Sequence, residues 1–244
     1  VQMLVLLPYL NQVGFRYQPR FDLKGTGLGA TFHAAKWMIG FVALTSVAQI
    51  VVSRLASTAT GADKVAGGWL TYQNAYLIWV LPHSLLTVSL ATAMLPAASR
   101  FAVARDFAGV AAETTRALRL ATTVLLPASI GLIALADPIT RLAYGHGTGA
   151  DDYHFVTWAL IGLAVRLVPF TVQYLYLRAF FAMDNTRTPF LLQIWISGAN
   201  AVFAILLVMA WNDPATVAAR LGVAYSLCYV VGVFITHWAL KRRL

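Results

Sequence analysis

The chain has 244 residues, of which 59% are hydrophobic and 11% are charged, with a formal net charge of +9. A soluble domain carries about 25% charged residues, so this chain has too few to cover a water-facing surface, and a lipid bilayer is the expected solvent. The single cysteine, Cys228, excludes a disulfide framework, and the basic residues are spread between apolar runs instead of forming the patch typical of nucleic-acid binding.

The first 36 residues are expected to hold the end of one helix and a linker. Residues 1–10 are apolar but lack the basic start and cleavage site of a signal peptide, so they are expected to end a preceding transmembrane helix. Residues 11–36 are more polar and are expected to form a cytoplasmic linker. We therefore expect the chain to be an internal fragment.

Six long apolar stretches follow. A membrane-spanning helix needs about 20 mostly apolar residues, whereas a barrel strand has about 9–11 and alternates with period 2, which these stretches do not. The sequence therefore predicts an all-α integral membrane lobe over 37–240, with a cytoplasmic tail at 241–244. The expected spans are 37–55, 70–99, 118–136, 154–177, 189–211 and 219–240.

Prolines lie within or beside most of these spans. Pro82 and Pro96 fall in the second, Pro127 in the third, Pro169 in the fourth, and Pro189 opens the fifth. Proline removes a backbone hydrogen bond and bends a helix, which indicates a bundle that moves or encloses a cavity. The ordinary frequency of proline in membrane helices explains the same pattern equally well.

The basic residues are distributed unequally between the two sides of the predicted lobe. Thirteen of the 18 fall in 11–36, 100–119, 178–188 and the tail, four fall on the opposite side, and Arg166 is left over. The side richer in Lys and Arg is normally cytoplasmic, so both ends of the six-helix lobe are expected there. Within this side, residues 101–118 are expected to form an amphipathic helix along the membrane interface, or a plain connector.

Arg166 lies midway along the fourth predicted span and is the first candidate for a binding site. A charge at bilayer depth is costly unless it is paired or hydrated, which favours a cavity and an anion such as a phosphate or pyrophosphate. The alternatives are a snorkelling side chain or pairing with a buried carbonyl. His83 and Asn74, both on the second span, are further cavity candidates, although a histidine beside Pro82 is more often a packed one.

The outer loop 144–154 gathers His146, Asp151, Asp152 and His154, which are residue types that ligate metals. Its glycines and the lack of a second cluster favour a solvated acidic loop instead. The sequence also lacks a nucleophile–base set, a phosphate-binding glycine loop and zinc-ligand spacing. We therefore expect a protein that is not an enzyme and that needs no metal or cofactor.

A polar segment separates the fourth and fifth spans. Its short polar side chains can accept hydrogen bonds from the free N–H groups of a helix start, and Pro189 suits the first turn of that helix. Its two arginines suit the anionic inner leaflet of the membrane. Local structure thus explains most of this segment, whose polar residues are Arg178, Asp184, Asn185, Thr186, Arg187 and Thr188.

Four stretches resemble those of the MviN/MurJ family of lipid II flippases, and the last three lie in the family's order and at its approximate spacing. Each is a weak motif alone, but the ordered set is specific and covers nearly the whole chain. Pro82, Pro96, Arg178, Asp184, Thr186, Arg187 and Pro189 fall within them. The stretches are VLLPYLNQVGFRYQPRFD (5–22), LPHSLLTVSLATAMLPAASR (81–100), LRLATTVLLPASIGLIALADPITRLAYGHG (118–147) and YLRAFFAMDNTRTP (176–189).

The resemblance implies the fold of the multidrug/oligosaccharidyl-lipid/polysaccharide (MOP) exporters, which include MATE transporters: two six-helix lobes around a central cavity. This chain would be the second lobe, and a missing N-terminal lobe would carry several cavity arginines. The implied function is alternating-access transport of lipid II, a polyprenyl-pyrophosphate-linked saccharide, across the bacterial plasma membrane for cell wall synthesis. Where the family tends to have an arginine five residues before Pro82, this chain has Leu77, which puts that substrate contact in doubt.

Other functions remain open at the level of sequence. An exporter of another polyprenyl-linked oligosaccharide would share the pattern, whereas a drug or cation exporter would be expected to bury an acid, and no acid falls inside a predicted span. A membrane-embedded glycolipid transferase would need acids or histidines at one membrane face, which only loop 144–154 offers. A scaffold for cell-wall enzymes is a further alternative.

Overall fold

The computed structural model describes residues 28–58, 68–147, 152–210 and 216–242, and these residues contain helices but no strands. The chain divides into two units, Val1–Lys36 and Trp37–Leu244. The expected helix end at 1–10 and most of the expected linker lie outside the described residues. The following paragraphs concern the second unit and the helix α2, which begins in the first.

Helix α2 (Leu28–Thr58) begins nine residues before the predicted start at 37. Residues 28–36 include three alanines and no proline, so nothing in them stops a helix from continuing past the apolar run. The last part of the predicted linker is therefore helical.

The second span consists of three consecutive helical segments. They are α3 (Trp69–Pro82), the π-helical turn η1 (His83–Thr87) and α4 (Val88–Val103). Pro82 has no N–H to donate, and the wider π turn follows it directly. Pro96, by contrast, lies inside α4 without ending it.

The predicted interfacial helix at 101–118 is not a separate element. The chain turns at Arg105, whose φ is 57°, and α5 (Phe107–Ala134) starts directly afterwards. The Asp106 carboxylate accepts a hydrogen bond from the N–H of Gly109 at 2.9 Å and so caps α5. This cap joins the amphipathic stretch to the third span, and a short helix, α6 (Ala136–Tyr144), follows.

The fourth span is broken into α7 (Tyr153–Ala164) and α8 (Leu167–Ala182), which meet at 46°. The ring of Pro169 clashes with a carbonyl four residues earlier in a continuous helix, which places the break at Val165 and Arg166. Helices α9 (Arg187–Met209) and α10 (Val217–Lys241) complete the unit, with Pro189 in the first turn of α9 as predicted.

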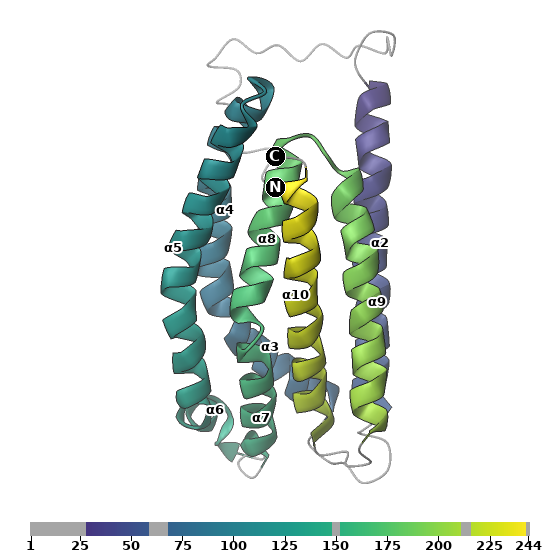
Figure 1. Ribbon diagram of the computed structural model, residues 1–244. Coiled ribbons are helices and arrows are strands. Elements are labelled where there is room, and N and C mark those ends of the chain that lie inside the picture. Colours follow the sequence, from purple (N-terminus) through teal and green to yellow (C-terminus); the bar gives the residue numbers. More distant parts are fainter. Residues whose placement is uncertain (1–27, 59–67, 148–151, 211–215, 243–244) are drawn as a thin grey trace, which may run out of the picture. The chain divides into compact units, whose positions relative to one another are not determined.

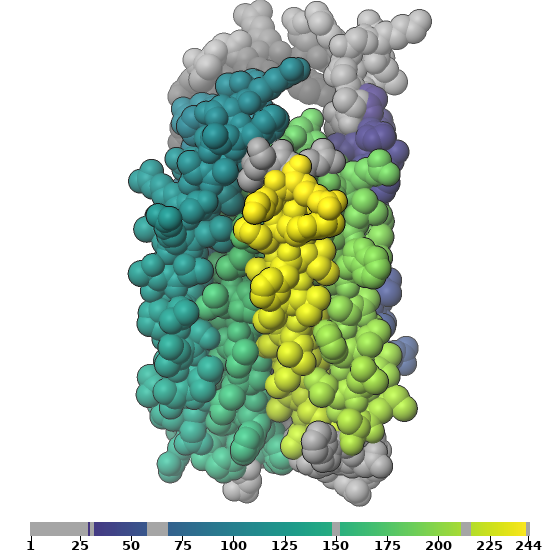
Figure 2. All heavy atoms as spheres, in the orientation of Figure 1, coloured from purple at the N-terminus to yellow at the C-terminus, as the bar shows by residue number. Residues whose placement is uncertain are grey.

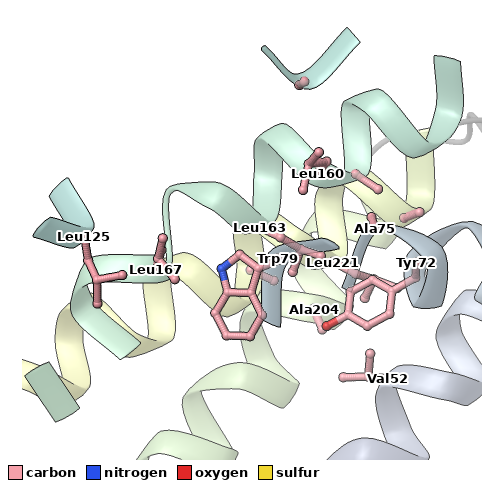
Figure 3. Close-up of a cluster of buried hydrophobic side chains, with 14 of the residues drawn as sticks. Val52, Tyr72, Ala75, Trp79, Leu125, Leu160, Leu163, Leu167, Ala204 and Leu221 are labelled. Carbon is pink, nitrogen blue, oxygen red and sulfur yellow. The ribbon is translucent and has the colours of Figure 1, made fainter. Parts of the chain in front are cut away.

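Five helices of the described chain are long and apolar enough to cross a membrane, or six if α7 and α8 form one span. This result confirms the predicted all-α membrane class. Helix α10 packs against α9, α7, α8 and α3, while α5 packs against α4 and α8 (Figure 1). Figure 3 shows the buried cluster that these helices share, with Val52, Tyr72, Trp79, Leu163 and Leu221 coming from different parts of the chain.

The outward faces are also apolar. On the face seen in Figure 2, α10 lies between α9 and the α5–α8 pair. Large hydrophobic side chains are exposed on three of these helices, including Leu126 on α5, Trp195 on α9 and Phe234 on α10. A surface of this kind suits lipid and not water.

Candidate functional site

Arg166 sits at the break between α7 and α8, where its own N–H donates to the carbonyl of Leu163 at 3.1 Å. Its side chain is only 3% exposed. The break leaves carbonyl groups without helical partners, and the hydroxyl of Ser129 on α5 donates to the carbonyl of Ala164 at 2.7 Å. The break is thus held by a hydrogen bond from a neighbouring helix.

Aromatic rings from three helices enclose the Arg166 guanidinium, and we call them the Arg166 cage. The guanidinium carbon lies 3.9 Å from the ring centroid of Trp79 and 4.6 Å from that of Tyr225. Such contacts stabilise a cation that has lost its water. The remaining rings, at 5.4 to 6.0 Å, are Phe170, Tyr76 and Tyr229.

The cage largely replaces an acidic partner. Arg166 Nε has no hydrogen-bond partner, and no carboxylate of the described residues pairs with the guanidinium. The snorkelling expected as one alternative does not occur, because the side chain is enclosed. The two cavities that lie against α2, α9 and α10 do not have Arg166 in their walls, so its contact with a ligand stays a prediction.

His83 lies in the π turn beside this cage and is 6% exposed. Its ring is stacked on Trp79, with centroids 6.0 Å apart, and its Nδ1 lies 3.4 Å from the hydroxyl oxygen of Thr171 on α8. Thr87 and Thr171 share a second hydrogen bond at 3.1 Å. This geometry is that of a packed, hydrogen-bonded histidine that joins the π turn to α8.

Asn74 is not among the residues that surround Arg166. Its backbone carbonyl accepts a hydrogen bond of 3.2 Å from the hydroxyl of Tyr144, at the end of α6. Burial raises the pKa of Tyr144, so this hydroxyl stays protonated and able to donate. The contact ties α3 to α6, and the Asn74 side chain is half-buried.

The polar segment between α8 and α9 forms a tight turn with two parts. Asp184 has a φ of 54° and follows the end of α8, so it terminates that helix. The Asn185 side chain accepts from the N–H of Thr188 at 3.1 Å and thus caps α9. Arg187 lies over the ring of Trp37, and Arg178 Nη2 donates to the hydroxyl of Tyr174.

Two adjoining cavities lie against α2, α9 and α10, and the larger also extends to α8; the sequence did not predict their position. The larger, about 480 Å³, includes Gln173 and Arg178 in its wall, and the smaller, about 110 Å³, includes Asn200. Thr45, Gln193 and Tyr229 line both. The signal that could have found them is the set of neutral polar residues on apolar helices, with Gln193, Ser197 and Asn200 spaced along one face of α9.

The described part of the outer loop does not form a metal site. His154 and Asp137 approach to 4.0 Å, but no group of three or more metal-ligating residues occurs among the residues with described positions. Asp151 lies outside them.

The bent helices, the apolar outer surface and the buried cation define one helical bundle of an integral membrane protein. Two solved structures share this fold. A "lipid II flippase MurJ, inward closed conformation" aligns with a TM-score of 0.71 at 21% identity, over 97% of this chain and 48% of that chain. A MATE structure in complex with MaL6 gives 0.74 at 16% identity, over 93% and 49%.

The family described as lipid II flippase MurJ matches residues 1–244, and the chain belongs to this family. The probable lipid II flippase MurJ of Vibrio cholerae serotype O1 (strain ATCC 39315 / El Tor Inaba N16961) is 26% identical over 190 residues. That alignment covers 78% of this chain and 35% of the relative. The chain therefore spans about a third of this relative and about half of each solved chain, and the resemblance seen in the sequence motifs is confirmed.

Proposed function

We propose that this chain is one lobe of a lipid II flippase, which moves the lipid-linked peptidoglycan precursor across the plasma membrane by alternating access. The observation that carries the proposal is the family match over all 244 residues. A transporter needs bendable helices and a stabilised interior charge, and the π turn, the α7–α8 break and the Arg166 cage have these properties. The remaining lobe would come from a part of the protein outside this chain.

The two irregular points of the lobe are in direct contact, which supports a shared hinge. The π turn holds His83 and Thr87, and both side chains approach Thr171 on α8, one turn after the break. Trp79, just before the π turn, stacks on the guanidinium at the break. Bending at one point therefore disturbs the other, as a rocking motion of the lobe requires.

Arg166, His83 and Asn74 remain our candidates for contact with the pyrophosphate-sugar headgroup. In this conformation Trp79 and Tyr225 close off the guanidinium, so direct contact requires that these rings move. With the rings in place, the Arg166 guanidinium still contributes a positive potential inside the lobe. This potential favours an anionic headgroup over a neutral one.

The charge distribution supports a cytoplasmic position for loops 11–36, 100–119, 178–188 and the C-terminus. Figure 1 shows the α4–α5 turn, the α8–α9 turn and the end of α10 at one end of the Trp37–Leu244 unit, with α6 at the other. The first end includes Arg105, Arg187 and Lys241. We propose that this end faces the cytoplasm.

The test is depletion of the full-length protein in its own bacterium, followed by measurement of lipid II in each membrane leaflet. Accumulation in the inner leaflet supports the proposal, and an unchanged distribution contradicts it. Accumulation of a different polyprenyl-linked saccharide indicates the other exporter. If Asp152→Ala abolishes function while lipid II still reaches the outer leaflet, the transferase is favoured.

A further inference from the structure

The larger cavity combines a mostly apolar wall with one cation and one unpaired amide. Its volume of about 480 Å³ lies within the range of ordinary ligand pockets, about 300–1,000 Å³. Its wall suits a hydrocarbon chain better than a water-soluble ligand. The apolar lining side chains include Met38, Phe41, Val42, Phe170, Leu177 and Phe181.

Gln173 supplies the unpaired amide. The side chain is 2% exposed, it lines the cavity, and neither its Nε2 nor its Oε1 has a hydrogen-bond partner among the described residues. Gln193, on the same cavity wall, instead donates Nε2 to the hydroxyl of Ser197 at 3.0 Å. Buried polar groups are nearly always hydrogen-bonded, so Gln173 points to an additional molecule inside the cavity.

Arg178 supplies the cation, one turn before the end of α8. Its side chain is half-buried and lines the cavity, and one of its N–H groups donates a hydrogen bond to the hydroxyl of Tyr174. No carboxylate within the described ranges forms an ion pair with it. The remaining N–H groups of the guanidinium form a fork that fits a phosphate.

We propose that this cavity binds an anionic glycerophospholipid. Its phosphate lies on Arg178, its glycerol ester oxygens accept from Gln173 Nε2, and an acyl chain lies along the apolar wall. The lipid comes from the leaflet at the basic end of the lobe, where Arg178 and Arg187 lie. Inorganic phosphate matches the cation but offers nothing to the apolar wall. The bound lipid is a resident component and not transported cargo, so this inference does not depend on the proposed flippase activity.

The test uses the full-length protein in phosphatidylcholine nanodiscs that contain phosphatidylglycerol with a photoactivatable acyl chain. Cross-linked peptides are then identified by mass spectrometry. We expect labelling of the α2 and α8 peptides that line the cavity. Arg178→Gln removes a charge-assisted hydrogen bond and lowers this labelling about tenfold. Val42→Trp fills the cavity and has the same effect, whereas Arg178→Lys retains part of the labelling.

Two variants separate binding from folding. Arg116→Gln removes an exposed cation on α5, which does not line this cavity, and leaves the labelling unchanged. Gln173→Leu removes the unpaired amide, so it preserves or raises the thermal stability while the labelling falls. The proposal is overturned if Arg178→Gln or Gln173→Leu labels like the native protein. It is equally overturned if photoactivatable phosphatidylcholine labels the same peptides as strongly as phosphatidylglycerol.

Discussion

The hydroxyl of Ser226 on α10 donates to the carbonyl oxygen of Gly162 on α7 at 2.9 Å. This bond marks a crossing at which the two helix backbones nearly touch. A Cβ atom added to Gly162 would lie 2.7 Å from the carbonyl oxygen of Ala219, and one added to Gly222 would lie 3.1 Å from the backbone of Gly162. Small residues allow membrane helices this approach, which brings α10 and its Tyr225 against α7 just before the break.

Gly162→Ala is therefore expected to destabilise the protein. The new methyl group meets a backbone oxygen, which cannot move aside as a flexible side chain would, and such overpacking costs about 1–3 kcal/mol. Thermal unfolding in detergent measures the effect. The matched control is Gly131→Ala on α5, where a Cβ meets nothing within 4 Å and alanine gains about 0.5–1 kcal/mol as the better helix former. Equal stability of the two variants would contradict the close crossing.

Two replacements of Arg166 distinguish the role of its charge from the role of its packing. Arg166→Met keeps a long apolar side chain inside the cage and removes the cost of burying a charge that has no carboxylate partner. We expect unfolding temperatures at or above that of the native protein, together with a loss of lipid II transport. Arg166→Lys keeps the charge but not the planar stacking on Trp79, and we expect partial transport. Full transport by Arg166→Met would show that the charge has no role.

The sequence was sufficient to predict an all-α membrane protein, but not the irregular points within its spans. Charge-free stretches locate the spans because a bilayer excludes charges, and this physical rule does not depend on helix pairing. The effects of the prolines differ: Pro169 coincides with a break and Pro82 with a π turn, whereas Pro96 and Pro127 lie inside continuous helices. Whether a neighbouring helix can accommodate the freed carbonyl decides the outcome, and one sequence does not contain that information.

The same limit applies to the site. Arg166 could be identified because a cation within an apolar run is conspicuous, but its cage could not, because the rings come from α3, α8 and α10. Gln173 was missed because a neutral amide does not interrupt a hydrophobic stretch. Its burial without a partner becomes visible only when α2, α8, α9 and α10 are assembled around the cavity.

Ser129→Ala tests the support of the α7–α8 break. The serine hydroxyl is buried and bonds the carbonyl of Ala164, so its removal leaves that carbonyl without this donor, at a cost of about 1–3 kcal/mol. Ser89→Ala is the control, since the exposed Ser89 hydroxyl bonds the Leu85 carbonyl four residues earlier in the chain, at 2.7 Å. Unfolding curves of both variants give the comparison. A loss for Ser129→Ala no larger than for Ser89→Ala would mean that the break does not need this bond.

Substitutions at two neighbouring residues of the turn between α8 and α9 are expected to have different effects on stability. Asn185→Ala removes the side chain that caps α9 and is expected to cost about 1 kcal/mol. Asp184→Gly relieves a positive φ and is expected to be neutral or slightly stabilising, because glycine adopts this conformation without strain. Both changes are measured by thermal unfolding. The assignment of the cap would be wrong if Asn185→Ala were as stable as Asp184→Gly.

The proposed orientation predicts which single cysteines react from each side of the membrane. Asp184 and His146 are both exposed, in the α8–α9 turn and just after α6, whereas the native Cys228 is fully buried and contributes little background. In intact cells that make the full-length protein, a membrane-impermeant maleimide is expected to label His146→Cys but not Asp184→Cys. Inverted vesicles are expected to give the opposite result. Trp195→Cys, on the apolar outer face of α9, is the control and should react from neither side because lipid covers it. Labelling of Asp184→Cys in intact cells would reverse the orientation and would place the basic end of the lobe outside, against the rule that governs the charge of membrane loops.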